Sequence, residues 1–218
     1  MENIEELLKN FKETEPKYET ILPYSNKKAL FTPFKVKDAK KIALILQEND
    51  KKLGLLAMYE ILKNNSTNIN VEELCLADAE HLFLQIRSKS VEELLNVIVN
   101  GKKYKIQISE ISSLNSIQDV TVELNEKVFL HLQTPTLKQL IKKETFTPEV
   151  YSKSCIKSIS INGQIFYVDK FLNKEAEEFI NNLPLLVIEK IKGFVEKEPK
   201  LFFKLEEGEV SGLLSFFT

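Results

Sequence analysis

The stretch Asp78–Ser109, DAEHLFLQIRSKSVEELLNVIVNGKKYKIQIS, decides the fold because it joins an amphipathic helix to a β-hairpin. In its first half, apolar residues fall at i, i+3, i+4 and i+7, the spacing that lines one face of a helix: Ala79, Leu82, Phe83 and Ile86. Asp78 is expected to cap the start of that helix. After Ser90 the apolar spacing changes to every second residue, which predicts strands.

The pair Asn100-Gly101 predicts a tight two-residue turn between two strands, since both central residues of a type I′ turn need positive φ. Such a turn sets Val97 opposite Tyr104, and it places the apolar residues of both strands on one face: Leu95, Val97, Val99, Tyr104, Ile106 and Ile108. Ser90 followed by Glu93 has the spacing of a capping box, so a helical turn before the first strand stays open.

Length and charge restrict the class of protein. A chain of 218 residues can form one large domain or two small ones, and 30 basic against 32 acidic residues give no general attraction to nucleic acid or anionic lipid. Apolar runs stop far short of the roughly 20 residues needed to span a bilayer. The two cysteines, Cys75 and Cys155, are expected to be reduced and buried.

The two ends of the chain carry apolar residues whose partner the sequence leaves open. Residues 2–12 predict a short helix with one apolar stripe: Ile4, Leu7, Leu8 and Phe11. This stripe packs either on its own domain or on a partner, and the tail residues Phe216 and Phe217 pose the same choice. We therefore expect an amino-terminal helix and tether at 1–19 and an α+β region at 20–218, with a subdivision near 112–118 left open.

The remaining chain predicts amphipathic helices packed with antiparallel hairpins, which is an α+β fold. Helices are expected from about residue 37, at 51–63, 136–143 and 173–181, and from about 184 to 196; strands are expected between 21 and 34, at 120–124 and 128–132, around Asn162-Gly163, and at the sheet edge over 201–205. The first helix should present Ala39 and Ile42 on its apolar face. Keeping the even-numbered apolar residues of 120–132 on one face requires a three-residue loop or a bulge.

No residues in the sequence form a recognisable catalytic, cofactor-binding or metal-binding pattern. The only histidines, His81 and His131, are about fifty residues apart and have no metal-ligand spacing with the cysteines. Neither cysteine belongs to a Cys-x-x-Cys pair, and the six glycines include no phosphate-binding loop. We therefore expect no enzyme activity, no cofactor and no metal.

Several segments, in this order, resemble one protein family: Leu22-Pro23, Phe31–Asp38, Asp78–Leu84, Ile86–Val91, Gln133–Thr136, Cys155-Ile156, Glu177–Phe179 and Leu214–Phe217. The chain is similar to the baseplate hub assembly proteins of T-even-type contractile-tailed bacteriophages. The residues that carry the resemblance include Phe34, Val36, Lys37, Asp78, Leu82, Phe83, Arg87, Ser90 and Pro135.

The resemblance implies a non-enzymatic phage protein, made late in infection, that helps to build the central hub of the tail baseplate in the host cytoplasm. Its partners would be other hub or tail proteins, with no nucleic acid and no membrane, and its oligomeric state stays open. A structural subunit retained in the virion is the alternative. Many members of the family carry Cys-x-x-Cys pairs at hairpin tips near the positions that match Asn100-Gly101 and Glu207-Gly208. This sequence has no cysteine there, so metal binding is not expected.

Overall fold

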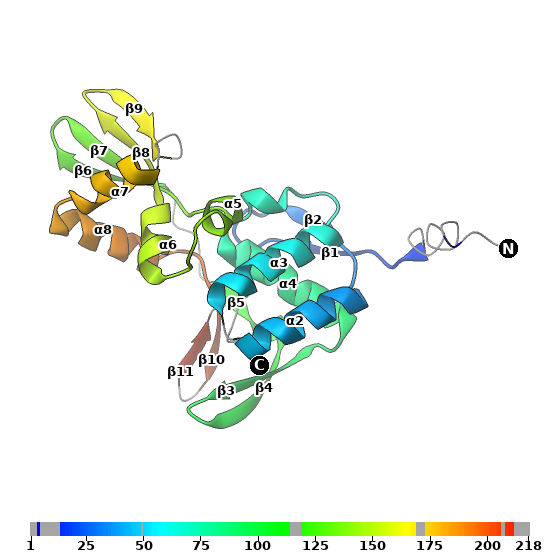
Figure 1. Cartoon of the computed structure of the whole chain (residues 1–218). Coiled ribbons are helices and arrows are strands. Elements are labelled where there is room, and N and C mark those ends of the chain that lie inside the picture. The colour runs from blue at the N-terminus through cyan, green and yellow to red at the C-terminus, as the bar shows by residue number, and fades with distance from the viewer. Residues whose placement is uncertain are drawn as a thin grey trace.

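The computed structural model describes residues 4, 14–48, 50–113, 119–168, 173–205 and 208–211, and these residues form an α+β fold (Figure 1). The helices are α2 (Val36–Glu48), α3 (Lys51–Asn65), α4 (Leu76–Ser90), α5 (Leu137–Ile141), α6 (Pro148–Ser154), α7 (Asn173–Asn181) and α8 (Leu185–Glu196), with 3₁₀ turns η1 (Val71–Glu73) and η2 (Ile108–Glu110).

The described strands form four antiparallel sheets. Two are hairpins, β1 (Tyr18–Ile21) with β2 (Lys28–Phe31), and β3 (Leu94–Val99) with β4 (Lys102–Gln107). The third has the order β11 (Gly208–Ser211), β10 (Leu201–Leu205), β5 (Ser112–Ser113). The fourth runs in chain order through β6 (Val120–Asn125), β7 (Val128–Leu132), β8 (Ile156–Ile161) and β9 (Gln164–Tyr167).

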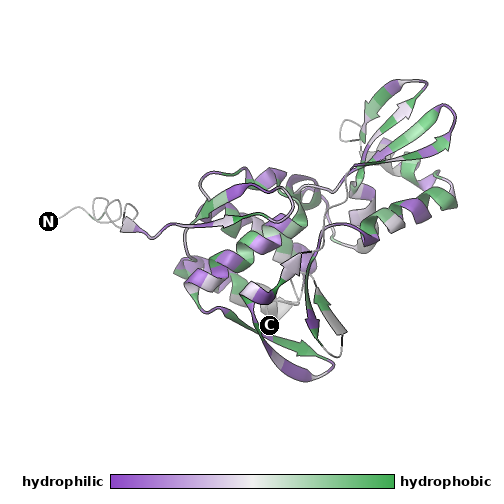
Figure 2. Cartoon of the chain, turned by 180° about the vertical axis from the view of Figure 1, so that it is seen from behind, coloured by the Kyte–Doolittle hydropathy of each residue, from purple (hydrophilic) through white to green (hydrophobic). Residues whose placement is uncertain are grey.

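Three hydrophobic clusters organise these elements. The first lies among α3, α4, α5 and the β1–β2 hairpin, and the second lies between the β6–β9 sheet and α6, α7 and α8. The third joins β3–β4 to β10–β11 and to α4. In Figure 1, α2, α3 and α4 lie side by side, the β6–β9 sheet with α7 and α8 stands apart from them, and α6 lies between. Figure 2 shows apolar and polar residues alternating along the elements, as expected where one face is buried.

Helix α4 confirms the predicted apolar face, because Ala79, Leu82, Phe83 and Ile86 are all buried. The predicted cap is wrong. Cys75 is the N-cap, without a side-chain hydrogen bond, and Asp78 lies inside the first turn with its carboxylate directed to another segment. The helix continues through Ser90, and no separate helical turn precedes β3.

The β3–β4 hairpin has the predicted turn and register. Asn100 and Gly101 have φ of 50° and 79°, and Val97 lies opposite Tyr104. The second Asn-Gly turn behaves in the same way, with Ile159 opposite Phe166. In β6–β7 a bulge between Glu123 and Asn125 keeps the even-numbered residues paired, as the apolar alternation requires.

Four expectations about local structure are corrected. Ala39 is exposed on α2, because Asp38, buried beside Asn65, takes the inward position together with Ile42. Strand β10 is central rather than at an edge, since β5 and β11 pair with its two sides. The first strand of the predicted 21–34 hairpin ends at Ile21 instead of beginning there, and α5 stops at Ile141. The suggested subdivision at 112–118 falls mostly on residues 114–118, outside the described part of the chain.

Candidate functional site

Each of the two histidines lies within hydrogen-bond distance of a threonine hydroxyl. His81 Nε2 lies 3.0 Å from Thr20 Oγ1, and His131 Nδ1 lies 3.1 Å from Thr121 Oγ1. Burial lowers the pKa of His81, although the nearby Asp78 opposes that shift. Among the described residues, no three or more His, Cys, Asp and Glu side chains are grouped to hold a metal ion.

The two cysteines are free and buried. Burial raises the pKa of the Cys75 thiol to about 12, and burial followed by the carboxyl of Glu198 raises that of Cys155 still further. A thiol that stays protonated and shielded from solvent is a poor nucleophile and a poor metal ligand. The structure therefore gives neither cysteine an environment suited to catalysis.

A buried carboxyl group lies where two lobes meet: the helical lobe, in which α2–α5 and the β1–β2 hairpin surround the first hydrophobic cluster, and the sheet lobe, in which the β6–β9 sheet packs with α6, α7 and α8 around the second (Figure 1). Glu198 follows α8, is only 4 % exposed, and accepts a hydrogen bond from the Cys155 thiol at 3.5 Å. Burial raises its pKa, while hydrogen bonds from Tyr151 and Cys155 partly oppose the shift. Its second oxygen, Oε2, is buried without a hydrogen-bond partner among the described residues. Such an arrangement costs free energy, so this junction is a chemically distinctive place in the fold.

The chain segment that crosses between the lobes is held on both sides. Gln133 N donates to Cys155 O at 2.8 Å in the sheet lobe, and Leu137 N donates to Leu74 O at 2.7 Å in the helical lobe. Thr136 caps α5 and also forms a β-bridge with Cys75. These bonds fix α5 and the crossing segment relative to both lobes.

An apolar groove of about 1070 Å³ opens beside Glu198, between α4 on one side and α6 and α8 on the other. Its apolar lining comes from both lobes: Leu76, Ala77, Phe146, Ile156, Ile180, Leu183, Leu185, Ile188, Ile191 and Val195. Leu185, in the first turn of α8, is 74 % exposed at this groove. A groove of this size and lining can accept an apolar helix or peptide.

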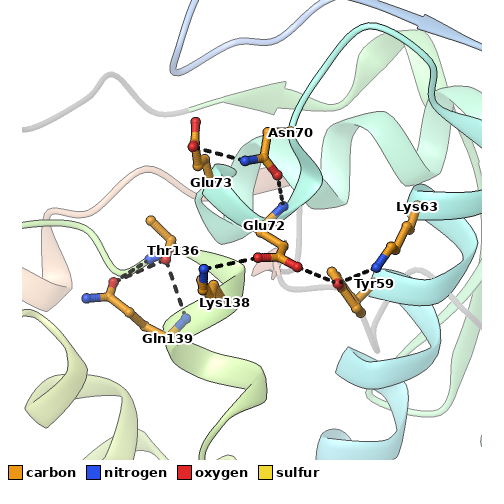
Figure 3. A network of polar contacts seen from close by, with 8 residues as sticks. All are labelled: Tyr59, Lys63, Asn70, Glu72, Glu73, Thr136, Lys138 and Gln139. Carbon is orange, nitrogen blue, oxygen red and sulfur yellow. Dashed lines mark hydrogen bonds and ion pairs between the residues drawn. The ribbon is translucent and has the colours of Figure 1, made fainter. Parts of the chain in front are cut away.

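A second network of polar contacts, on the outside of the helical lobe, attaches α5 to α3 and η1 (Figure 3). The carboxylate of Glu72 accepts a hydrogen bond from the Tyr59 hydroxyl at 3.0 Å and pairs with Lys138 at 3.3 Å. The hydrogen bond from Tyr59, followed by the interaction with Lys138, lowers the pKa of Glu72. This network positions α5, and none of the residues drawn in Figure 3 lines the groove beside Glu198.

The residues that carry the family resemblance form the frame of the helical lobe. The rings of Phe34 and Phe83 pack with centroids 5.2 Å apart, and Phe34 N donates to Ser90 Oγ at 2.6 Å. Leu82 is fully buried beside them. These contacts hold the segment that follows β2 against the carboxyl-terminal half of α4.

The other resemblance residues divide between framework and surface. The Asp78 carboxylate accepts hydrogen bonds from Tyr24 N at 2.8 Å and Ser25 N at 3.0 Å, which holds the β1–β2 turn on α4. Arg87 Nη1 donates to Leu94 O at 3.4 Å, and Pro135 is buried in the crossing segment. By contrast, Val36 and Lys37 are exposed at the start of α2.

Most residues expected at a partner-binding surface lie outside the described part of the chain: Leu7, Leu8, Phe11, Phe216 and Phe217. Ile4 is described and is 73 % exposed. Sequence reasoning missed the groove and Glu198, because their residues come from segments far apart in the chain. The one available signal was a single glutamate between a helix end and Pro199, just before the apolar strand β10.

The described residues thus define an α+β protein in which helices pack with small antiparallel sheets and an apolar groove opens between α4, α6 and α8. The family model described as T4 bacteriophage base plate protein matches residues 15–217, and this chain belongs to that family. It is thus a phage baseplate protein. No curated protein and no solved structure matches it. Among the described helices, none is long and apolar enough to cross a membrane.

Proposed function

We propose that this protein acts without enzymatic activity in assembling the central hub of the tail baseplate, where it holds hub components through apolar surfaces as an assembly chaperone. Membership of the base plate family supports the setting. The observation that carries the binding role is the apolar groove of about 1070 Å³ between α4, α6 and α8. Protein partners are recognised largely through such concave apolar surfaces with aromatic or aliphatic anchors.

The amino-terminal stripe and the tail phenylalanines are further candidates for contact with hub or tail proteins. Burying Ile4, Leu7, Leu8 and Phe11 would contribute several kcal/mol at about 25 cal/mol per Å² before the cost of ordering the segment. In this proposal residues 1–19 are a helix and tether, residues 20–218 are the α+β region, and the protein works in the host cytoplasm and at the virion tail.

A capture experiment tests this role. Hub proteins would be pulled down with the full chain, with a chain that lacks residues 1–13, and with the Leu7→Asp, Leu8→Asp double variant. The truncation stops before Thr14 because Tyr18 pairs with Phe31 in the β1–β2 hairpin. We expect reduced capture by both altered chains. Equal capture by all three chains would show that the stripe is not part of the binding surface. If no folded version captures hub proteins, the proposed assembly role is wrong.

A structural subunit that stays in the mature baseplate is the second candidate function, supported by the same family membership. Mass spectrometry of purified particles and of infected-cell lysate separates the two roles. Presence in lysate alone is the result expected for an assembly factor. Stoichiometric presence in particles would favour the structural subunit.

A further inference from the structure

The groove between α4, α6 and α8 extends to the segment that leads into β10. Pro199 and Lys200 belong to its lining, and β10 begins at the next residue, Leu201. Strand β11 pairs with β10 so that Ser211 lies opposite Phe202. Paired residues lie about 5 Å apart and two residues of extended chain span at most about 7 Å, so Ser211 lies within about 12 Å of Lys200. The residues that follow Ser211 therefore start close to the groove.

The direction of β11 leads the chain towards this lining. Because β11 is antiparallel to β10, a continued ladder would set Leu213 opposite Lys200 and Leu214 opposite Pro199. Residues 212–217, when extended, span at most about 20 Å. This length is enough to pass Lys200 and follow much of α8, whose 12 residues rise about 18 Å. The segment can thus reach the groove of its own chain.

The composition of residues 212–217, GLLSFF, matches the lining of the groove. The segment lies outside the described part of the chain, carries no charged side chain, and contains Leu213, Leu214, Phe216 and Phe217. The described residues that line the groove are also largely apolar. Contact between the two surfaces would remove apolar area of both from water. We infer that residues 212–217 lie in the groove of their own chain and cover its apolar lining.

Attachment at Ser211 favours this segment over an occupant from another molecule. A short flexible connection gives a tethered segment an effective concentration on the order of millimolar, so a second copy or a hub protein at lower concentration competes poorly. A hub protein would have to displace residues 212–217 before it could bind the groove. That displacement rests on the proposed function, whereas the place of the segment in the groove concerns the purified chain alone.

Tryptophan fluorescence tests the inference, because the sequence contains no tryptophan. Neighbouring residues of an extended chain point to opposite sides, so Phe216→Trp and Phe217→Trp, made separately, place a single reporter on each side of the segment. We expect acrylamide to quench at least one reporter severalfold less in the folded protein than in the chain unfolded in urea. If both reporters are quenched as strongly as in the unfolded chain, the inference is wrong.

A bulky maleimide label placed in the groove gives a matched comparison. Lys190 and Lys192 are both exposed on α8, but of the two only Lys192 lines the groove. Cys75 and Cys155 are buried, so Lys192→Cys or Lys190→Cys can be labelled selectively in the folded protein. The label at residue 192 should restore quenching of the shielded reporter, and the label at residue 190 should leave it shielded. Equal effects of the two labels would contradict the inference.

A chain that ends after Ser211 keeps the β10–β11 pairing but lacks the segment. This shortened chain should bind more of an apolar fluorescent dye than the full chain, and the label at residue 192 should remove the gain. Unchanged dye binding would count against a covered groove.

Sedimentation velocity shows which molecule supplies the segment. We expect the shielded reporter in a monomer, with shielding that persists on dilution, because the contact lies within one chain. A dimer whose shielding disappears on dilution would show that a second copy supplies the segment, and the inference would be overturned.

Discussion

Val97 lies directly opposite Tyr104 across the β3–β4 hairpin, and this pairing depends on two successive residues with positive φ, Asn100 and Gly101. The register puts Leu95, Val97 and Ile106 against the third hydrophobic cluster. A slip of one residue would turn these side chains to solvent. The turn thus determines which face of the hairpin packs against α4 and β10.

Gly101→Ala should lower the free energy of unfolding by about 1 kcal/mol, because an alanine side chain is disfavoured at a φ of 79°. Gly101→Val should lower it further, since a β-branched residue tolerates positive φ poorly. Gly193→Ala in α8 is the matched control: a Cβ there also has nothing within 4 Å, but the helical backbone favours alanine by roughly 0.5–1 kcal/mol. Chemical denaturation should shift in opposite directions for the two alanine variants. Unchanged stability of the Gly101 variants would refute the tight turn.

Asp78→Ala should destabilise the protein by about 2–4 kcal/mol, because it leaves Tyr24 N and Ser25 N without their acceptor and empties a fully buried position. Asp50→Ala provides the comparison, since Asp50 caps α3 at an exposed position and its loss should cost only about 1 kcal/mol. If urea denaturation gives equal losses for the two variants, Asp78 contributes no more than an ordinary cap.

The raised pKa of Glu198 predicts that part of the stability is lost as pH rises. The folded protein binds the proton of the Glu198 carboxyl more tightly than the unfolded chain does. The protonated carboxyl therefore contributes its full stabilisation below the pKa of the unfolded state, near 4.5, and this stabilisation is lost as pH rises through the pKa of the folded state. Glu198→Gln should therefore raise the melting temperature at neutral pH and flatten its fall from acidic to neutral pH. The exposed neighbour Glu196→Gln is the control, and it should leave the profile unchanged. An identical pH profile for wild type and Glu198→Gln would contradict the assignment.

Protein purified without an affinity tag should contain no stoichiometric zinc. Burial raises the pKa of the Cys75 and Cys155 thiols, which disfavours the thiolate form that binds zinc. Each histidine ring lies within hydrogen-bond distance of a threonine hydroxyl. Elemental analysis after dialysis provides the measurement, with a zinc-finger protein carried through the same steps as a positive control. One zinc per chain would show that this expectation is wrong.

Local pattern was enough to predict the parts of the fold that depend on neighbours in sequence. Both Asn-Gly turns, the β6 bulge, the Thr136 cap and the buried face of α4 follow from residues within one or two elements. Asp78 was misassigned because its partners, Tyr24 and Ser25, are more than fifty residues away. The central place of β10 depends on the distant strand β5, which no local pattern reveals.

The candidate site could not be predicted from the sequence, because it too is formed by residues far apart in the chain. Its groove is lined by α4, α6 and α8, and each helix taken alone shows only an ordinary apolar stripe. Glu198 looks like a solvated charge until the fold buries it beside Cys155 and Tyr151. The resemblance residues pointed to the right family, yet most of them turn out to hold the helical lobe together.

The pairing of β5 with β10 has a consequence for how the chain is made. Residues 114–200 stand between these strands, so the whole β6–β9 lobe emerges from the ribosome before Leu201 and Phe202 can pair with Ser112 and Ser113. Until then the apolar face of β3–β4 lacks Leu201 and Val210, two of its buried neighbours. Such late pairing of strands far apart in the sequence slows folding and leaves an intermediate with exposed apolar surface. A nascent chain paused before residue 201 should therefore be the form most exposed to aggregation and to host chaperones.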